Sequence, residues 1–201
     1  MKTIKIWPIV IFSLLMTYCS RAPEIHYYLI DYPIVAAPDN ETPKHDIRLG
    51  VTTFKADPLY NEMRLVYRDS RYEGKYYNYH RWIAAPDRLI TDRVIEQFSH
   101  SNVFKQVVPF PRFTGVDLLL GGQIKAIEEW DEGDQWQARV KIRFDLIQRD
   151  RNELIWQTEV EHILPVATKT PAAVVKGINK CVQLTIDSAL KKLDKFLTDS
   201  K

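Results

Sequence analysis

Cysteine is scarce in this sequence: among 201 residues, the only two are Cys19 and Cys181. An exported domain that depends on disulfide bonds would contain several cysteines, so a disulfide framework is excluded. The sequence also lacks a CxxC pair, an HExxH helix, a glycine-rich phosphate loop and a GxSxG elbow. The five histidines are scattered without the spacing of metal ligands: His26, His45, His80, His100 and His162.

The carboxylates offer no better candidate for catalysis. Glu128 and Glu129 are adjacent in a predicted strand, so their side chains point to opposite sides and cannot act as an acid and base pair. Asp131, Glu132 and Asp134 surround a glycine and could bind calcium, but the segment is shorter than an EF-hand loop and is more typical of a solvated turn. We therefore expect no enzyme activity, cofactor or metal; the alternative is a secreted enzyme with an unrecognised site.

The first residues combine a basic start with an apolar run. Lys2 and Lys5 carry positive charge with no acid between them, and residues 6–16 are apolar apart from one serine. This run is shorter than the ~20 residues that a membrane-spanning helix needs, and the combination is typical of a secretory signal peptide. We predict that residues 1–18 are this signal peptide; the alternative is a buried element of an ordinary domain.

Cys19 follows the apolar run at the position of a lipoprotein lipidation site. Such sites have an aliphatic residue and two small residues before the cysteine; here Met16 and Thr17 fit, and Tyr18 is larger than usual. We predict that Cys19 carries lipid such as palmitate, and that residues 19–25 form a tether to the membrane. No aspartate follows the cysteine, which favours the periplasmic face of the outer membrane over retention at the inner membrane.

Removal of the signal peptide leaves a chain without net charge. The full sequence has 28 basic and 26 acidic residues, and the first 18 residues contain two lysines and no acid, which leaves 26 of each sign. Nucleic-acid-binding domains usually carry a basic excess, so we expect no nucleic-acid partner. Residues 26–198 have the length and the apolar content of a single domain.

The first half of this domain consists of short apolar stretches separated by turns. Residues 86–101 repeat apolar side chains at helical spacing, which predicts a helix that begins at Pro86. The other apolar stretches are short, and several are bounded by prolines. They predict strands, of which the third and fourth form a hairpin, at residues 25–32, 46–54, 64–68, 71–79 and 105–108.

The second half is more regular. Apolar side chains occupy every second position of residues 135–148, and residues 116–130 and 154–164 show similar patterns beside two short turns, which predicts a three-stranded antiparallel meander. Thr170 and Pro171 are residue types that begin helices, and an apolar stripe follows them. We therefore expect an α+β domain: a mostly antiparallel sheet with two amphipathic helices packed on one face.

Two features of this half carry specific expectations. Gly121 and Gly122 interrupt their strand, which indicates a bulge or the close approach of another backbone segment. Cys181 lies on the apolar stripe of the last helix, where we expect a buried and unreactive thiol.

The segment from residue 64 to residue 82 is rich in tyrosine and arginine, which are frequent in protein–protein hot spots. Strand alternation sends about half of these side chains to the outer face, so we expect some of them to bind a partner. In the alternative interpretation, half of them simply pack beneath the first helix. The candidate interface residues are Tyr67, Tyr72, Tyr76, Tyr77, Tyr79, Arg81 and Trp82.

Three motifs occur in a fixed order. They are Tyr-Tyr-Leu at residues 27–29, the segment PLYNEMRLVYR at residues 58–68, and Trp82 shortly before the proline that begins the first predicted helix. In this order they resemble the ABC-type transport auxiliary lipoproteins, the PqiC-like group. The resemblance covers residues 26–195, with the stretch SRYEGKYYNY as an extended insertion.

The resemblance implies a role that composition alone does not indicate. Proteins of this family sit at the outer membrane and work with an MCE-domain protein and an inner-membrane ABC transporter to move lipids across the envelope. This chain would be a non-catalytic docking component, able to self-associate into a homo-oligomer. The competing hypothesis is an envelope lipoprotein that binds a small ligand such as a glycan through its aromatic cluster.

Overall fold

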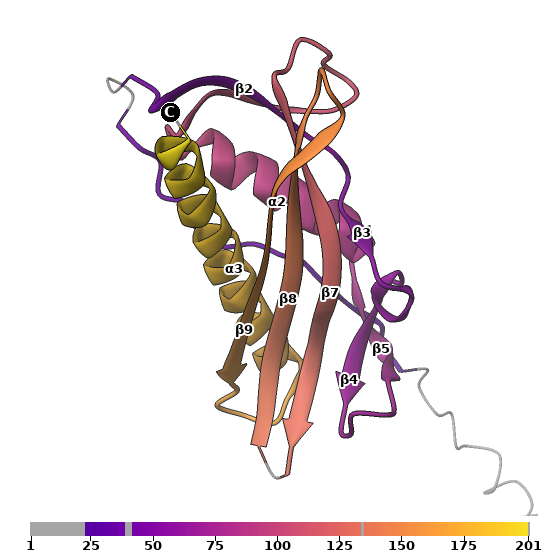
Figure 1. The fold of residues 1–201 in the computed structure, drawn as a ribbon. Helices are drawn as coiled ribbons and strands as arrows, with labels where there is room; N and C mark the ends of the chain where they lie inside the picture. The colour runs from indigo at the N-terminus through magenta and orange to yellow at the C-terminus, as the bar shows by residue number, and fades with distance from the viewer. Residues whose placement is uncertain (1–22, 39–41, 134, 201) are drawn as a thin grey trace, which may run out of the picture.

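Figure 1 shows a computed structural model of the chain, which describes residues 23–38, 42–133 and 135–200. The predicted signal peptide, residues 1–18, and the predicted anchor Cys19 lie outside the described residues. None of the described helices has the length and apolar character needed to cross a bilayer. The described residues form an α+β domain in which one nine-stranded sheet is combined with two α-helices.

The order of elements starts with five strands and ends with a long helix. The helices are η1 (Pro58–Tyr60, a single 3-10 turn), α2 (Pro86–Ser99) and α3 (Pro171–Asp199). The strands are β1 (His26–Tyr28), β2 (His45–Val51), β3 (Lys55–Ala56), β4 (Arg64–Arg68), β5 (Lys75–Trp82), β6 (Phe104–Pro109), β7 (Leu118–Glu132), β8 (Gln135–Gln148) and β9 (Glu153–Pro165).

The sheet is mixed, which corrects the expected mostly antiparallel arrangement. β7, β8 and β9 are antiparallel neighbours, and β4 and β5 form an antiparallel hairpin. However, β2, β3 and β4 all pair with β7 in parallel, as do β1 with β5 and β2 with β6. Parallel pairs need a long crossover between their strands, and α2 lies in the connection that separates β2–β4 from β6 and β7.

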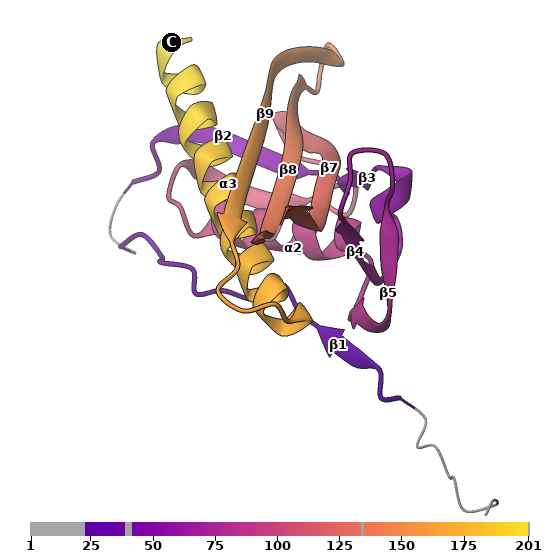
Figure 2. The same ribbon diagram turned by 90° about the horizontal axis from the view of Figure 1, so that it is seen from below.

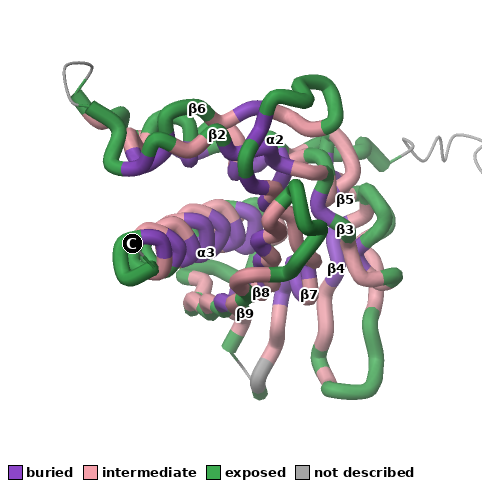
Figure 3. Tube along the Cα trace, turned by 45° about the horizontal axis from the view of Figure 1, so that its top comes forward, coloured by how far each residue is buried: buried purple, intermediate pink, exposed green. Residues whose placement is uncertain are grey.

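Helix α3 begins where the sequence predicts. The Thr170 side chain accepts a hydrogen bond from the Ala173 amide at 3.3 Å, and Pro171 occupies the first turn. The sheet curls so that α3 lies along its inner side, between the β2–β6 region and β8–β9 (Figures 2 and 3). The apolar stripe of α3 is buried, and Gln97 of α2 donates a hydrogen bond to Asp187 of α3, so both helices share this core.

The segment that follows β1 is fastened to α3. The Asn179 side-chain oxygen accepts from the Asp31 amide at 2.6 Å, and its amide group donates to the Leu29 carbonyl at 3.2 Å. Near the other end of the same helix, Asp194 accepts from Lys44 at 2.7 Å and lies 3.0 Å from the ring of His45. Helix α3 therefore holds both the segment after β1 and the start of β2 in place.

Strand boundaries differ from prediction where a partner strand limits them. The expected strand at residues 71–79 is found as β5, Lys75–Trp82, and residues 69–74 form the turn. A register irregularity between β4 and β5 disturbs the side-chain alternation of β5. The expected strand at residues 25–32 is reduced to β1, which pairs with β5 at three positions.

The glycine pair in β7 marks a close contact between backbones. A Cβ atom at Gly122 would overlap the carbonyl oxygen of Arg143 and lie 2.6 Å from the ring of Phe54. A Cβ atom at Gly121 would overlap the Thr52 hydroxyl. This confirms the close approach that the sequence indicates, and larger side chains are excluded at Gly122 because the obstacle is backbone.

Cys181 is fully buried, as predicted, and its thiol lies 3.4 Å from the carbonyl oxygen of Ala138. Burial raises the pKa of the thiol to about 12, so the reactive thiolate is scarce at neutral pH. We expect a thiol reagent to label the native protein only as fast as it unfolds. The control is Tyr72→Cys, which places a thiol at a highly exposed turn and should react at once. Equal labelling rates at both positions would contradict the prediction.

Candidate functional site

The β4–β5 hairpin carries the predicted aromatic residues and joins the sheet at the end of β7. Tyr67 of β4 lies beside Glu129 of β7, and Ala138 of β8 lies on the other side of Glu129. Ala138 packs against Gly177 of α3, so Glu129 belongs to the helix-facing side of the sheet. Glu128 therefore belongs to the opposite, outer side, which confirms that the two carboxylates point apart.

The helix-facing side holds a group of interlocked aromatic rings. The Tyr77 hydroxyl donates a hydrogen bond to Glu129 Oε2 at 2.8 Å. The ring of Tyr77 lies 4.9 Å from that of Tyr67 and meets the ring of His80 edge-on at 5.4 Å. His80 Nδ1 is 2.9 Å from the Tyr28 hydroxyl, which connects the group to β1. These five residues form the helix-side cluster.

Asp131 adds a second carboxyl group to the helix-side cluster, two residues after Glu129 on the same strand. Glu129 is only 1% exposed, and its Oε1 atom and the Oδ1 atom of Asp131 are buried without a hydrogen-bond donor in the described part of the chain. Burial raises the pKa of Glu129 to about 7, and the nearby Asp131 carboxyl also raises it. Two facing acceptors without a donor are best satisfied by one proton held between them.

The outer side of β7 holds a charged network around Glu128, which is 0% exposed. The Tyr60 hydroxyl donates to Glu128 Oε2 at 2.6 Å, and the Arg139 guanidinium lies 3.0 Å from Oε1. Arg68 lies 3.8 Å from the same oxygen. Burial raises the pKa of Glu128, whereas Tyr60 and the two arginines favour its charged form. The network fastens η1, β4 and β8 to β7.

Trp130 lies on this outer side between the two arginines of the network. The Arg68 guanidinium is 4.9 Å from its ring centroid, and that of Arg139 is 5.2 Å away. Cations at this distance from an indole face are attracted by the ring. Trp130 therefore keeps both arginines in position beside Glu128.

Tyr76 and Tyr77 face different environments, as strand alternation predicts. Tyr76 donates a hydrogen bond to the Leu59 carbonyl at 3.1 Å and lies beneath the Arg64 guanidinium, 4.1 Å from its ring centroid. Its contacts are thus to η1 and β4, whereas Tyr77 contacts Glu129. Both rings are partly buried and engaged in contacts within the domain.

The other candidate interface residues differ widely in exposure. Trp82 is only 1% exposed and belongs to the core. Tyr72, in the hairpin turn, is 98% exposed, and Tyr79 is also exposed. Arg81 is partly buried. Of the aromatic residues in this segment, Tyr72 and Tyr79 are therefore the most accessible to a partner.

Several residues of these clusters were not expected to matter from the sequence. The sequence presents Glu128 and Glu129 only as a rejected acid and base pair, Tyr60 only as part of the PLYNEMRLVYR motif, and Arg139 only as a polar position of its strand. The available signal was the pair of glutamates within the otherwise apolar run AIEEW. If both faces of a central strand are covered, two successive charges in it must both be compensated by partners.

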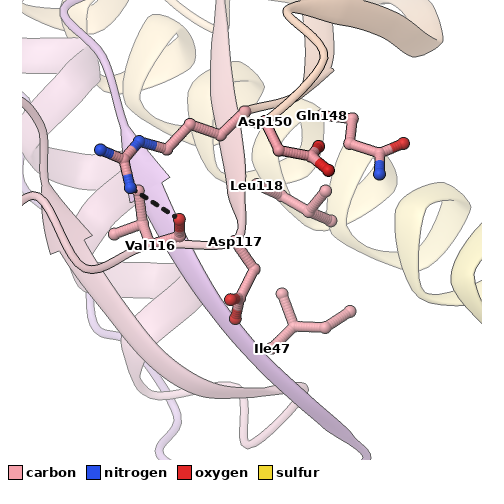
Figure 4. A pocket seen from close by; sticks show the side chains of 7 residues that line it. Ile47, Val116, Asp117, Leu118, Gln148 and Asp150 are labelled. Atoms are coloured by element: carbon pink, nitrogen blue, oxygen red, sulfur yellow. Dashed lines mark hydrogen bonds between the residues drawn. The ribbon is translucent and has the colours of Figure 1, made fainter.

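A surface pocket lies at the other end of β7 (Figure 4). It has a volume of about 580 Å³, and Arg149 donates a hydrogen bond to the Val116 carbonyl at its rim. No aromatic ring lines it. The lining residues are Ile47, Val116, Asp117, Leu118, Gln148, Arg149 and Asp150.

The turn that was considered for calcium contains Asp134, which lies outside the described residues. Among the residues that the structure describes, no group of three His, Cys, Asp or Glu side chains is placed to hold a metal ion.

Comparisons with known proteins identify relatives of this architecture. The family described as "ABC-type transport auxiliary lipoprotein component" matches residues 27–188. The crystal structure of protein XCC0632 from Xanthomonas campestris, a DUF330 protein, is similar with a TM-score of 0.74 at 18% identity, over 87% of this chain and 98% of that one. Protein CT253 from Chlamydia trachomatis has a TM-score of 0.51 at 5% identity, over 75% and 96%. No curated relative matches the chain.

Proposed function

The chain belongs to the ABC-type transport auxiliary lipoprotein family, and from this premise we propose that it docks an MCE-domain protein at the outer membrane. In this role the chain performs no catalysis. The MCE-domain protein and an inner-membrane ABC transporter move the lipid across the envelope, and this lipoprotein fixes the outer-membrane end of the path. The lipidated Cys19 and the tether of residues 19–25 hold it to the periplasmic face of that membrane.

The observation that carries the docking proposal is the form of the β4–β5 turn. The Ser70 hydroxyl accepts hydrogen bonds from the amides of Tyr72 and Glu73 at 3.4 and 3.2 Å. Arg68 donates to the Arg71 carbonyl at 2.6 Å, which connects the turn to the network around the buried glutamate of the outer side. The turn is therefore held in one shape while the Tyr72 ring remains in solvent.

A fixed turn with an exposed aromatic tip is suited to binding a partner. An aromatic ring contributes a large contact area with few rotatable bonds, and a turn that is already ordered loses little entropy on association. The helix-side cluster and the outer network lie beneath the turn and hold its base. We therefore assign binding to Tyr72 and Tyr79, and support of the hairpin to Tyr67, Tyr76 and Tyr77.

Alanine substitutions separate these two roles. Tyr72→Ala should reduce capture of the MCE-domain partner about tenfold or more, as loss of a hot-spot ring does, while leaving the melting temperature unchanged. Tyr76→Ala and Tyr77→Ala should each lower the free energy of unfolding by roughly 2 kcal/mol, because each removes a partly buried ring and the donor of a hydrogen bond within the domain. Pull-down and thermal unfolding of the same preparations give both values.

Leu154→Ala is the matched control for Tyr72→Ala, because Leu154 is an exposed apolar residue on β9 at the far edge of the sheet. It should change neither partner capture nor stability. Normal capture by Tyr72→Ala and by Tyr79→Ala would place the interface elsewhere on the domain.

A further inference from the structure

An exposed apolar strip runs along β1 and the end of β5, at one edge of the sheet. Figure 2 shows β1 at the margin of the fold, on the opposite side from the free end of α3. Ile25, Tyr27 and Leu29 alternate along this edge, Arg81 of β5 lies beside Tyr27, and the Ile83 amide donates to the carbonyl of the residue before Leu29. These five residues form the β1 strip, whose four apolar members are 39–59% exposed.

Arg81 gives the β1 strip a positive charge that the domain does not neutralise. Its Nε atom is buried without an acceptor, and within the described ranges its guanidinium makes no hydrogen bond or ion pair. An arginine that is partly covered and still lacks an acceptor has lost hydration without replacement. Its fork of donors matches the oxygens of a phosphate group, which an external ligand can provide.

The chain between the anchor and the β1 strip is short. Six peptide units separate Cys19 from Ile25, so even a fully extended tether spans only ~20 Å. With Cys19 acylated, the Ile25 end of the β1 strip cannot lie farther than this from the bilayer surface. Exposed aliphatic residues with tyrosine and arginine among them are the side chains that settle at the boundary between headgroups and acyl chains.

We infer that the β1 strip rests on the phospholipid headgroup layer beside the acylated Cys19, with Arg81 paired to lipid phosphate. The inference rests on the proposed lipid anchor and adds an orientation to it. β5 runs parallel to β1, and its eight residues separate the hairpin turn from Arg81 by roughly 20 Å along the strand, so Tyr72 lies beyond the end of the β1 strip and not within it.

Fluorescence quenching in vesicles tests this contact. The acylated full-length protein is reconstituted into vesicles of phosphatidylethanolamine and phosphatidylglycerol, with a bimane label on Leu29→Cys or on Leu154→Cys. Both positions are half exposed, and they lie at different edges of the sheet. Brominated acyl chains should quench the label at position 29 roughly threefold more strongly than the label at 154, since interfacial residues reach the acyl boundary. Equal quenching at the two positions would overturn the inference.

A second measurement does not require the anchor. The Cys19→Ala chain without its signal peptide is sedimented with the same vesicles, and Leu29→Ser should weaken this association about tenfold, whereas Leu154→Ser should not. If Leu29→Ser binds the vesicles as well as the parent chain does, the inference is overturned. It is also overturned if the label at position 29 becomes shielded in the absence of lipid as the protein concentration rises, because a second copy of the chain would then cover the strip. Mass analysis of the mature N-terminus reports acylation independently. It therefore distinguishes a chain that lacks the lipid anchor from a chain whose β1 strip does not contact the membrane.

Discussion

Replacing Glu128 by alanine should lower the free energy of unfolding by about 3–5 kcal/mol, the usual cost of breaking a buried ion pair from one side. The substitution removes the acceptor of the Tyr60 hydroxyl and the counter-charge of Arg139 and Arg68. It also leaves a cavity on the outer side of β7. Urea unfolding followed by circular dichroism measures the loss, with the m-value checked for a change in the unfolded state.

Glu161→Ala is the control for this prediction. Glu161 accepts a hydrogen bond from the same Arg139, at 2.7 Å, but its side chain is 35% exposed. Exposed pairs of this kind contribute up to about 1 kcal/mol, so the control should be nearly neutral. If the two substitutions cost the same, burial of Glu128 does not determine the strength of the network.

Glu129→Gln should change how stability depends on pH. The folded state holds the Glu129 proton with a pKa of about 7, whereas an ordinary glutamate has 4.5. Between these values the folded protein keeps a proton that the unfolded chain has released, so stability falls as pH rises through this range. By about pH 8 the accumulated loss reaches roughly 3 kcal/mol, since one pKa unit corresponds to 1.36 kcal/mol.

The glutamine variant removes this loss because its side chain cannot ionise, and its amide group can donate to the buried Asp131 oxygen. It should therefore match the parent protein near pH 5 and be more stable by roughly 2–3 kcal/mol near pH 8. Thermal unfolding across this pH range supplies the comparison. Glu153→Gln, at the exposed start of β9, should leave the profile unaltered. A parent profile that is flat between these pH values would rule out the raised pKa.

The elements that the sequence predicts best are those that depend on local rules. The alternation over residues 135–148 coincides with β8, and the capping pair at Thr170 and Pro171 marks the start of α3. Strand direction cannot be predicted from local rules, because it depends on the path of the chain between one strand and the next. Nothing in residues 46–54 indicates that β2 will lie parallel to β7, and this is why the mixed sheet was not anticipated.

The candidate site was anticipated by composition but not by arrangement. The tyrosines of the hairpin attract attention in the sequence, yet their exposure depends on the irregular register of β5 and on the η1 turn that covers the outer side. The same turn supplies Tyr60, which makes the burial of Glu128 tolerable. Sequence alternation assigns each glutamate to a face, but it does not say that both faces are covered.

The attachment of Leu29, Asp31, Lys44 and His45 to α3 imposes an order on folding. A chain is synthesised from its N-terminus, so Asp31 and Lys44 are made well before Asn179 and Asp194, to which they bind. Contacts across about 150 residues form late, because the intervening chain must first be ordered. The region around β1 and the start of β2 therefore cannot complete its packing until the C-terminal helix has been synthesised.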